Sequence, residues 1–241
     1  MTETVDFNDD PETTLSKTKA TEESLNYRGR STLRSDGSRK RKEILNAALR
    51  IIAREGIRGV RHRAVAKEAD VSLSSTTYYF KDIHELIADA FTLYAENSLQ
   101  ENQPLEQAAT SLLASLGQPL NKVSSETKQL VVSKLTSFLV DHIKRQSSQT
   151  EARLIEWAFR QAATQDASLA PAVLAMQNEV ASSAEKILEL LGSNNPKADA
   201  LITVTAIQAL EYKICISPED VSDEDIHKTM EHLMARVLMA I

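Results

Sequence analysis

The stretch that constrains this chain most is RHRAVAKEADVSLSSTTYYF, residues 61–80. Val65, Ala66 and Ala69 recur at helical spacing within it, while the basic positions fall on other faces. The run stops at Asp70, a residue type that tolerates turn conformations. The pattern therefore predicts a short helix that ends in a tight turn.

A second short helix is expected directly after this turn, over about residues 72–79. The Ser72 hydroxyl can accept a hydrogen bond from the first turn and so cap this helix. Two short helices joined by a tight turn form a helix-turn-helix, whose second helix fits the major groove of B-DNA. The hydroxyl groups of this helix suit base edges and phosphate oxygens. They belong to Ser72, Ser74, Ser75, Thr76, Thr77, Tyr78 and Tyr79.

A plainer interpretation is a solvated turn, because short Ser/Thr-rich segments often form turns. The flanking charge favours DNA binding instead. The chain has a net charge of −6, yet residues 27–42 hold seven basic residues against Asp36 alone. Local field rather than total charge attracts phosphate, so an acidic chain with one basic block suits a nucleic-acid partner.

Composition favours an all-α fold, since glycine and proline number only six each in 241 residues. Cys215 is the only cysteine, so we expect no internal disulfide and a reducing cytoplasm. No apolar run reaches the length of a membrane span, and residues 1–10 do not resemble a secretory signal.

Hydrophobic periodicity and capping residues predict helices along most of the chain. The first ends before Gly56, which suits a left-handed C-terminal cap. Asp82 and Glu85 resemble a capping box that opens a connecting helix. Outside the helix-turn-helix, helices are expected at about residues 38–55, 83–100, 104–117, 125–146, 149–165, 168–192, 197–213 and 222–241.

Residues 1–37 are expected to be disordered, because they are rich in Thr, Ser and acids and show almost no apolar periodicity. One interpretation is a solubilising tail, acidic and then basic. The alternative is a functional arm in which Arg28, Arg30 and Arg34 lie along a phosphate backbone or enter a minor groove.

An ordered set of apolar, small and capping positions runs through residues 38–98: Ile44, Leu45, Ala47, Ala48, Gly56, Val65, Ala66, Ala69, Val71, Ser72, Phe80 and Leu86. This set resembles the DNA-binding domain of the TetR family of transcriptional regulators. The resemblance implies an all-α homodimer, with an N-terminal three-helix domain at residues 38–98 that binds a palindromic operator. A larger helical domain, residues 99–241, would hold the effector pocket and the dimer interface. Most members of the family repress and release DNA when a small ligand binds.

The chain departs from the family pattern in the motif itself. Arg61 stands where a capping Thr or Ser is usual, and glycines common in the family are replaced by Asp70 and Ser74. Thr77 occupies the usual Tyr position, and Ile83 replaces a frequent lysine that meets phosphate.

Basic residues are expected to hold phosphates, and the second helix of the motif is expected to read the groove. Arg63 is also expected to reach a guanine, since its fork fits O6 and N7. Arg39 and Lys40 oppose the dipole of the helix they begin, which favours a nearby phosphate over a plain solvated turn. The predicted DNA contacts are Arg39, Lys40, Arg61, His62, Arg63, Leu73, Ser74, Ser75, Thr77, Tyr78, Tyr79 and Lys81.

By resemblance, the helices at residues 168–191 and 196–214 would form a four-helix bundle with their symmetry mates. A small apolar or aromatic effector is expected from the large side chains of the central helices, each of which also suits ordinary core. Arg153 or Arg160 near the pocket could hold a carboxylate or phosphate. The candidate pocket residues are Phe91, Tyr94, Phe138, His142, Trp157, Arg160, Gln161, Met176 and Tyr212.

No catalytic or metal-binding motif is evident, so we expect no enzyme and no cofactor. The sequence is interpreted as a DNA-binding repressor that a small molecule releases from a palindromic operator. The alternatives are a regulator of the same fold that activates or acts without ligand, and an all-α enzyme with a helix-turn-helix-like segment.

Overall fold

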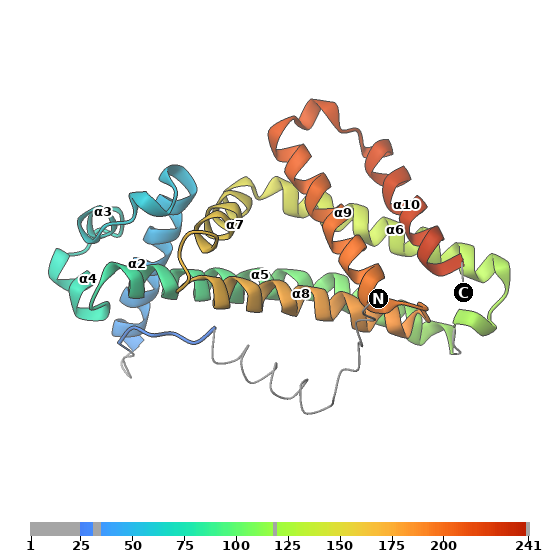
Figure 1. Ribbon diagram of the computed structural model, residues 1–241, viewed down its shortest axis with the longest axis horizontal. Coiled ribbons are helices and arrows are strands. Elements are labelled where there is room, and N and C mark those ends of the chain that lie inside the picture. Colours follow the sequence, from blue (N-terminus) through green and yellow to red (C-terminus); the bar gives the residue numbers. More distant parts are fainter. Residues whose placement is uncertain (1–24, 31–34, 118–119, 240–241) are drawn as a thin grey trace, which may run out of the picture.

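The computed structural model describes residues 25–30, 35–117 and 120–239, and all regular secondary structure within these residues is helical. The all-α expectation is therefore confirmed. The long helix α5 (Ile83–Leu116) runs through the molecule and joins its two ends (Figure 1). At one end it carries the small helices α2 (Ser35–Glu55), α3 (His62–Glu68) and α4 (Leu73–Tyr79).

The remaining helices extend from α5 toward the other end. α7 packs against α2, while α8 packs against both α5 and α9. α6 lies between α9 and α10 and contacts both. These elements are α6 (Ser125–Ser148), α7 (Thr150–Ala163), α8 (Ala170–Leu190), α9 (Pro196–Ile216) and α10 (Asp223–Met239), with short 3-10 turns η1 (Ile57–Gly59), η2 (Leu120–Lys122) and η3 (Pro218–Asp220).

Capping residues begin several helices where the sequence predicts them. The side chains of Ser72, Asp82 and Asn195 each accept from a backbone N–H three residues further on. Gly117 ends α5 with a φ of 64°, in the left-handed region. Gly56 has the expected positive φ of 70°, but its ψ of 179° lies outside that region, so the predicted left-handed cap is wrong in detail.

The predicted break between residues 100 and 104 is also wrong, because α5 continues through Pro104. Proline removes one backbone donor and frees the carbonyl four residues earlier, which belongs to Gln100. Both residues are exposed, so water can solvate that carbonyl. Packing of α5 against α8 and α6 stabilises the helix despite the lost hydrogen bond.

Two buried clusters form the core. The first joins α2, α3, the start of α5, α7 and the start of α8 around aromatic rings. The second joins the end of α5 to α6, α8, α9 and α10, and its described buried members are aliphatic residues and methionine. The rings of the first cluster belong to Tyr79, Phe80, Phe91, Tyr94 and Phe159.

The expected disorder of residues 1–37 is wrong in two places. Residues 25–30 have defined positions, with Leu25 packed against the first cluster, and α2 already begins at Ser35. Residues 1–24 and 31–34, Arg34 among them, lie outside the described part of the chain. Within the described part, no helix combines the length and hydrophobicity needed to cross a membrane.

Candidate nucleic-acid interface and ligand cavity

The turn between α3 and α4 is fixed by backbone hydrogen bonds. Val71 N donates to Ala66 O at 2.9 Å, and Asp70 N donates to Lys67 O at 3.3 Å. This is the Schellman arrangement, which places one residue in the left-handed region. Asp70 occupies that position with a φ of 50°. The turn predicted at Asp70 is confirmed, and its geometry sets the angle between α3 and α4.

The inner face of α4 packs into the protein. Thr76 is fully buried, and its Oγ1 donates to Leu73 O at 2.8 Å and lies 3.2 Å from His62 Nδ1. Tyr79 follows three residues later on the same face and is 7% exposed. The expected place of Tyr79 on the DNA-facing surface is therefore wrong, because helical periodicity turns its ring into the first core.

The outer face of α4 is open to solvent. Leu73 and Tyr78 are 42% and 54% exposed, and Ser74 and Thr77 are also exposed. Ser75 is half-buried, with its hydroxyl 2.9 Å from that of the capping residue Ser72. This face therefore offers hydroxyl groups and one aromatic ring to a partner.

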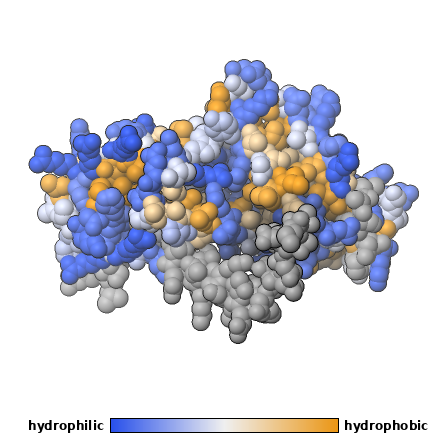
Figure 2. Space-filling model, viewed as in Figure 1, coloured by the Kyte–Doolittle hydropathy of each residue, from blue (hydrophilic) through white to orange (hydrophobic). Residues whose placement is uncertain are grey.

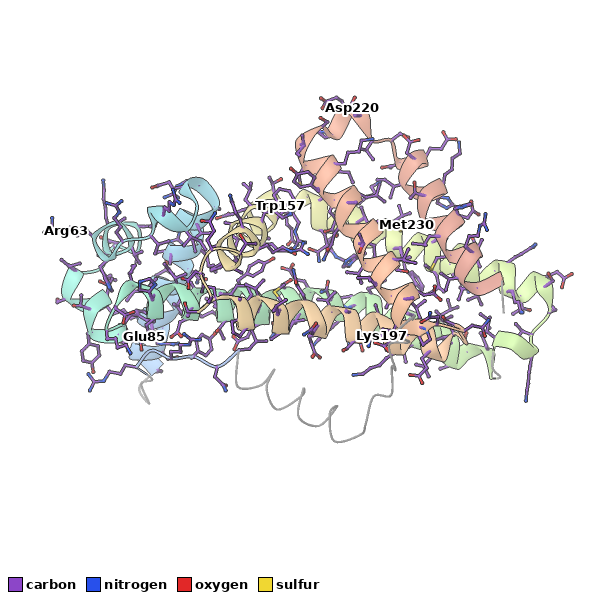
Figure 3. The ribbon with its side chains drawn as sticks, viewed as in Figure 1. Arg63, Glu85, Trp157, Lys197, Asp220 and Met230 are labelled. Carbon is purple, nitrogen blue, oxygen red and sulfur yellow. The ribbon has the colours of Figure 1, made fainter. Side chains whose placement is uncertain are left out.

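Exposed cations flank this face. Arg61, Arg63 and Lys81 are exposed, and Arg63 lies on the outer side of α3 at the far end of the molecule (Figure 3). In the first turns of α2, Lys40 is exposed, and Arg39 pairs with Asp36 at 2.8 Å. Figure 2 shows that this end of the molecule is mainly hydrophilic.

Arg61 precedes α3 and provides no side-chain cap, so the departure from the usual Thr or Ser leaves this helix end without a capping side chain. Its other end is held by Glu68, which accepts from Arg54 Nη2 at 2.7 Å and Arg50 Nε at 2.9 Å. The hydrogen bonds from Arg54 and Arg50 lower the pKa of Glu68 to about 2. These pairs fasten α3 to α2.

A cavity of about 320 Å³ lies in the other half of the molecule, between α5, α6, α8 and α9. Much of its wall is apolar, including Leu135, Leu139, Ile187 and Ile207. The polar part of the wall includes buried residues of α6, α7 and α9: His142, Gln146, Arg153, Glu156, Thr203 and Glu211.

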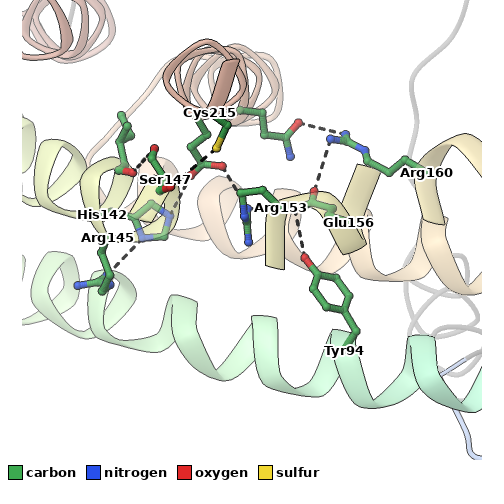
Figure 4. A network of polar contacts seen from close by, with 11 residues as sticks. Tyr94, His142, Arg145, Ser147, Arg153, Glu156, Arg160 and Cys215 are labelled. Carbon is green, nitrogen blue, oxygen red and sulfur yellow. Dashed lines mark hydrogen bonds and ion pairs between the residues drawn. The ribbon is translucent and has the colours of Figure 1, made fainter. Parts of the chain in front are cut away.

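The buried charges in this wall do not balance. Arg153 Nη1 lies 3.0 Å from Glu156 Oε2 and 3.2 Å from Glu211 Oε2, so these two carboxylates share the one buried guanidinium of the wall (Figure 4). Glu156 has a second, half-buried partner in Arg160, whose Nη1 lies 3.5 Å from Glu156 Oε1. Burial raises the pKa of Glu211 to about 7, although Arg153 opposes this shift. Burial, with Arg145 and Arg153 nearby, lowers the pKa of His142 to about 4, so its imidazole is neutral at pH 7.

Three buried polar atoms of the cavity wall have no hydrogen-bond partner among the described residues. They are Gln146 Oε1, Arg153 Nε and Thr203 Oγ1. A buried polar atom without a partner costs about 1–3 kcal/mol. A molecule that supplied the missing partners would recover part of that free energy.

Comparison with known proteins identifies the DNA-binding end. A sequence model described as "Bacterial regulatory proteins, tetR family" matches residues 44–90. The HTH-type transcriptional regulator PksA of Bacillus subtilis (strain 168) is 39% identical over 61 residues. These residues therefore resemble the DNA-binding domain of the TetR family. The match with PksA covers 25% of this chain and 30% of the length of PksA.

The TetR-like fold extends beyond this domain. A transcriptional regulator from Rhodococcus sp. Rha1 superposes with a TM-score of 0.58 at 18% identity, over 83% of this chain and 96% of that one. The multidrug binding protein EbrR, complexed with imidazole, superposes with a TM-score of 0.50 at 21% identity, over 81% and 89%. The similarity of residues 44–90 to transcriptional regulators agrees with the expectation that this chain is no enzyme.

Only two of the predicted pocket residues, His142 and Met176, line the cavity. Phe91 instead packs in the first core, 4.8 Å from the ring of Phe159. Tyr94 also packs there, and its hydroxyl donates to Glu156 Oε2 at 3.3 Å from outside the cavity. Periodicity located the buried faces of these helices but not the core that each face joins.

The other predicted pocket residues also lie elsewhere. Trp157 and Tyr212 pack edge to face at 4.9 Å, and Tyr212 is 50% exposed. Arg160 donates to Gln208 at 3.1 Å without lining the cavity itself. Gln161 is exposed, and Phe138 packs on the rim of the second core. Among the described residues, no aromatic side chain lines the cavity, so the expected aromatic wall is wrong.

The sequence interpretation missed the polar cavity residues Gln146, Glu156, Thr203 and Glu211. A signal was present for one of them, because Glu211 is the one acidic residue in residues 200–216 of α9. Within the described residues, no group of three or more His, Cys, Asp or Glu is placed to hold a metal ion.

Proposed function

We propose that this TetR-family regulator is a homodimeric repressor, bound to a palindromic operator through α3 and α4 and released by a small molecule. The observation that carries DNA binding is the exposed outer face of α4 between the cations Arg61, Arg63 and Lys81. A helix of this kind fits the major groove, and flanking cations hold phosphates. The proposed contacts are Arg39, Lys40, Arg61, His62, Arg63, Leu73, Ser74, Ser75, Thr77, Tyr78 and Lys81.

Exposed apolar side chains on α8 and α9 support dimerisation. The two helices pack against each other, and both carry large hydrophobic residues that are more than half exposed. Such a patch is typical of a protein–protein interface, and two helices from each protomer form a four-helix bundle. The exposed residues are Leu174 and Leu190 on α8 and Leu201, Ile202 and Ile216 on α9.

The cavity supports a ligand with an apolar body and a cationic head that donates hydrogen bonds. Its apolar wall suits an aliphatic chain, and its volume is near the lower limit of small-molecule pockets. An amine would give Glu211 the counter-charge that Arg153 divides between two carboxylates. The same head could donate to Gln146 Oε1, which has no partner among the described residues.

Helix α7 connects the cavity with the helices proposed to bind DNA. Its residues Arg153 and Glu156 line the cavity, while Ile155 and Phe159 pack in the first core. α7 also contacts α2 of the DNA-binding domain. A ligand amine that replaced Arg153 beside Glu211 of α9 would release a contact of α7, the helix that packs against α2.

DNA binding is tested by selection from a random duplex pool. We expect the protein to enrich a palindromic sequence with half-sites about one helical turn apart, ~34 Å, or more. Failure to enrich any sequence at low salt would contradict the proposed function.

Release is tested with three molecules that differ only in the head group: n-octylamine, n-octanol and octanoic acid. We expect the amine alone to raise the melting temperature and to lower operator affinity at pH 8, and Glu211→Gln to abolish both effects. Equal effects of the three molecules would contradict the cationic head. The absence of any effect would favour a regulator that acts without such a ligand.

A further inference from the structure

A buried carboxylate fastens a short segment before α2 to the DNA-binding domain. Asp89 of α5 has 0% exposure. Its Oδ1 accepts from Arg28 N at 2.6 Å and its Oδ2 accepts from Gly29 N at 2.8 Å. The guanidinium of Arg41 pairs with the same carboxylate. If the segment left, Asp89 would lose both backbone donors, so the docked position is strongly favoured.

The backbone of the segment passes too close to the protein for a larger residue. A Cβ at Gly29 would lie 2.8 Å from Asp89 Oδ2 and 2.8 Å from the Phe80 ring. One residue later, Arg30 N donates to Tyr79 O at 2.9 Å, at the end of α4. The segment is therefore bound to both α5 and α4.

Tyr27 anchors the other side of the segment. Its hydroxyl donates to Glu96 Oε2 at 2.6 Å, and the Arg41 guanidinium lies 4.5 Å from the centre of its ring. Cation–π contacts of this kind are attractive, because the negative face of the ring meets the positive charge. Residues 27–30 thus have a fixed path through contacts with three different helices, α2, α4 and α5.

This path presents two cations beside the candidate DNA surface. The side chains of Arg28 and Arg30 are exposed. The guanidinium of Arg30 lies 4.6 Å from the centre of the Tyr78 ring, on the outer face of α4. A positive charge is thereby held at the C-terminal end of the helix proposed to enter the major groove.

We propose that residues 27–30 are a DNA-binding arm in which Arg28 and Arg30 contact phosphates next to the major-groove site, with Asp89 as the positioning residue. The proposal rests on the proposed DNA binding by α3 and α4. A loose basic tail would have to be ordered when it binds DNA, whereas this arm is ordered beforehand. Because the contacts with Asp89 already hold the segment in place, binding of phosphate by Arg28 and Arg30 does not have to order it.

The test compares two double variants of the full chain. Arg28→Ala with Arg30→Ala removes the arm cations, and Lys228→Ala with Arg236→Ala removes two exposed cations of α10 as the matched control. Affinity for the selected operator is measured over a series of KCl concentrations. Each lost phosphate contact should reduce the salt slope by about 0.9, so the arm variant should lose about 1.8 per protomer and the control nothing.

Gly29→Ala tests the positioning of the arm with both arginines intact. The added Cβ should displace the segment and reduce the salt slope in the same direction as the arm variant. A lower melting temperature with an unchanged salt slope, in this variant or in the arm variant, would mean that the segment is a structural staple and would overturn the proposal. If the unaltered protein selects no DNA, the proposed function and the arm fail together; if it binds and only the slopes are unchanged, the arm alone fails.

Discussion

The two halves of the molecule treat buried charge in opposite ways. In the DNA-binding half, the single carboxylate of Asp89 receives two backbone donors and the guanidinium of Arg41, whose Nε is the one buried atom of this group without a partner among the described residues. In the cavity half, two carboxylates share one buried guanidinium, and three polar atoms of the wall have no partner among the described residues. The difference fits the proposed function, in which the DNA-binding half is rigid and the polar groups of the cavity half gain their missing partners when a ligand binds.

The two hydrophobic cores also differ in how easily their side chains can rearrange. Aromatic rings lie among the aliphatic side chains of the first cluster, where Phe159 is 4.8 Å from the ring of Phe91 and 6.5 Å from that of Tyr94. The second cluster is aliphatic and adjoins the cavity. Rings have few rotatable bonds, whereas leucine and methionine side chains readjust more easily. The second half is thus better suited to changing shape around a ligand.

The largest expected effect is on stability in the ring-filled core. Phe159→Ala should lower the free energy of unfolding by about 3–5 kcal/mol, because the fully buried ring leaves a new void. Leu139→Ala, at the cavity wall, should cost nearer 2 kcal/mol, because part of its side chain already faces empty space. Urea unfolding measures both changes. Equal losses would contradict the contrast between the two cores.

The next largest effect is on the pH dependence of stability, through Glu211 in the cavity half of the molecule. Between about pH 4.5 and 7, the unfolded chain releases the Glu211 proton while the folded chain keeps it, so stability from this group falls as pH rises. Glu211→Gln removes that slope. Relative to the unaltered protein, the variant should gain up to about 3 kcal/mol between pH 5 and pH 8. Chemical denaturation at both pH values measures the gain.

His142 faces Glu211 at 4.0 Å and acts in the opposite direction. Its pKa is lowered to about 4, so stability from this group is present above about pH 6.5 and is lost as pH falls toward 4. His142→Asn serves as the control, since it should flatten only the acid side. If Glu211→Gln shows the same pH dependence as the unaltered protein, Glu211 is ionised throughout and the pocket charge balance is different.

In the DNA-binding half, Arg63→Ala should weaken operator binding by about 1–3 kcal/mol, because the variant loses a guanine or phosphate contact. Since Arg63 is exposed, the melting temperature should not change. A salt-matched titration measures the affinity, with Arg236→Ala on α10 as control. Equal affinities for the two variants would remove Arg63 from the site.

The smallest effect is at the uncapped start of α3. Arg61→Thr should raise the free energy of unfolding by about 0.5–2 kcal/mol, since a threonine hydroxyl can accept from the first turn. The same change should weaken DNA binding, because it removes an exposed cation. Thermal unfolding and operator titration together would reveal this trade between stability and function. A variant that gains stability and keeps full affinity would place Arg61 outside the interface.

The DNA-binding half was largely predictable because its signals are local. A capping hydroxyl at Ser72 and a turn residue at Asp70 each determine the geometry of residues next to them. Pro104 shows the limit of such signals, since tertiary packing carries α5 through a residue that usually begins or breaks a helix. Asp89 is the one acidic residue among the buried positions of α5. It was not used to predict from the sequence that residues 27–30 are held in place.

The cavity was not predictable in the same way. Phe91 and His142 both lie on buried helix faces, yet one joins the ring-filled core and the other the cavity wall. Which face meets which core depends on how helices from distant parts of the sequence cross. Periodicity along a single helix contains no information about that crossing.

Helix α5 has a mechanical consequence of its own. At 1.5 Å per residue, its 34 residues form a rod about 51 Å long that is shared by both halves of the molecule. Tilting such a rod by about 5° moves its far end by about 4 Å. Pro104 lies two-thirds of the way along, at the point where one backbone hydrogen bond is missing. A modest bend at Pro104 would move the longer part of α5 and, with it, the helices α2, α3 and α4 that this part carries.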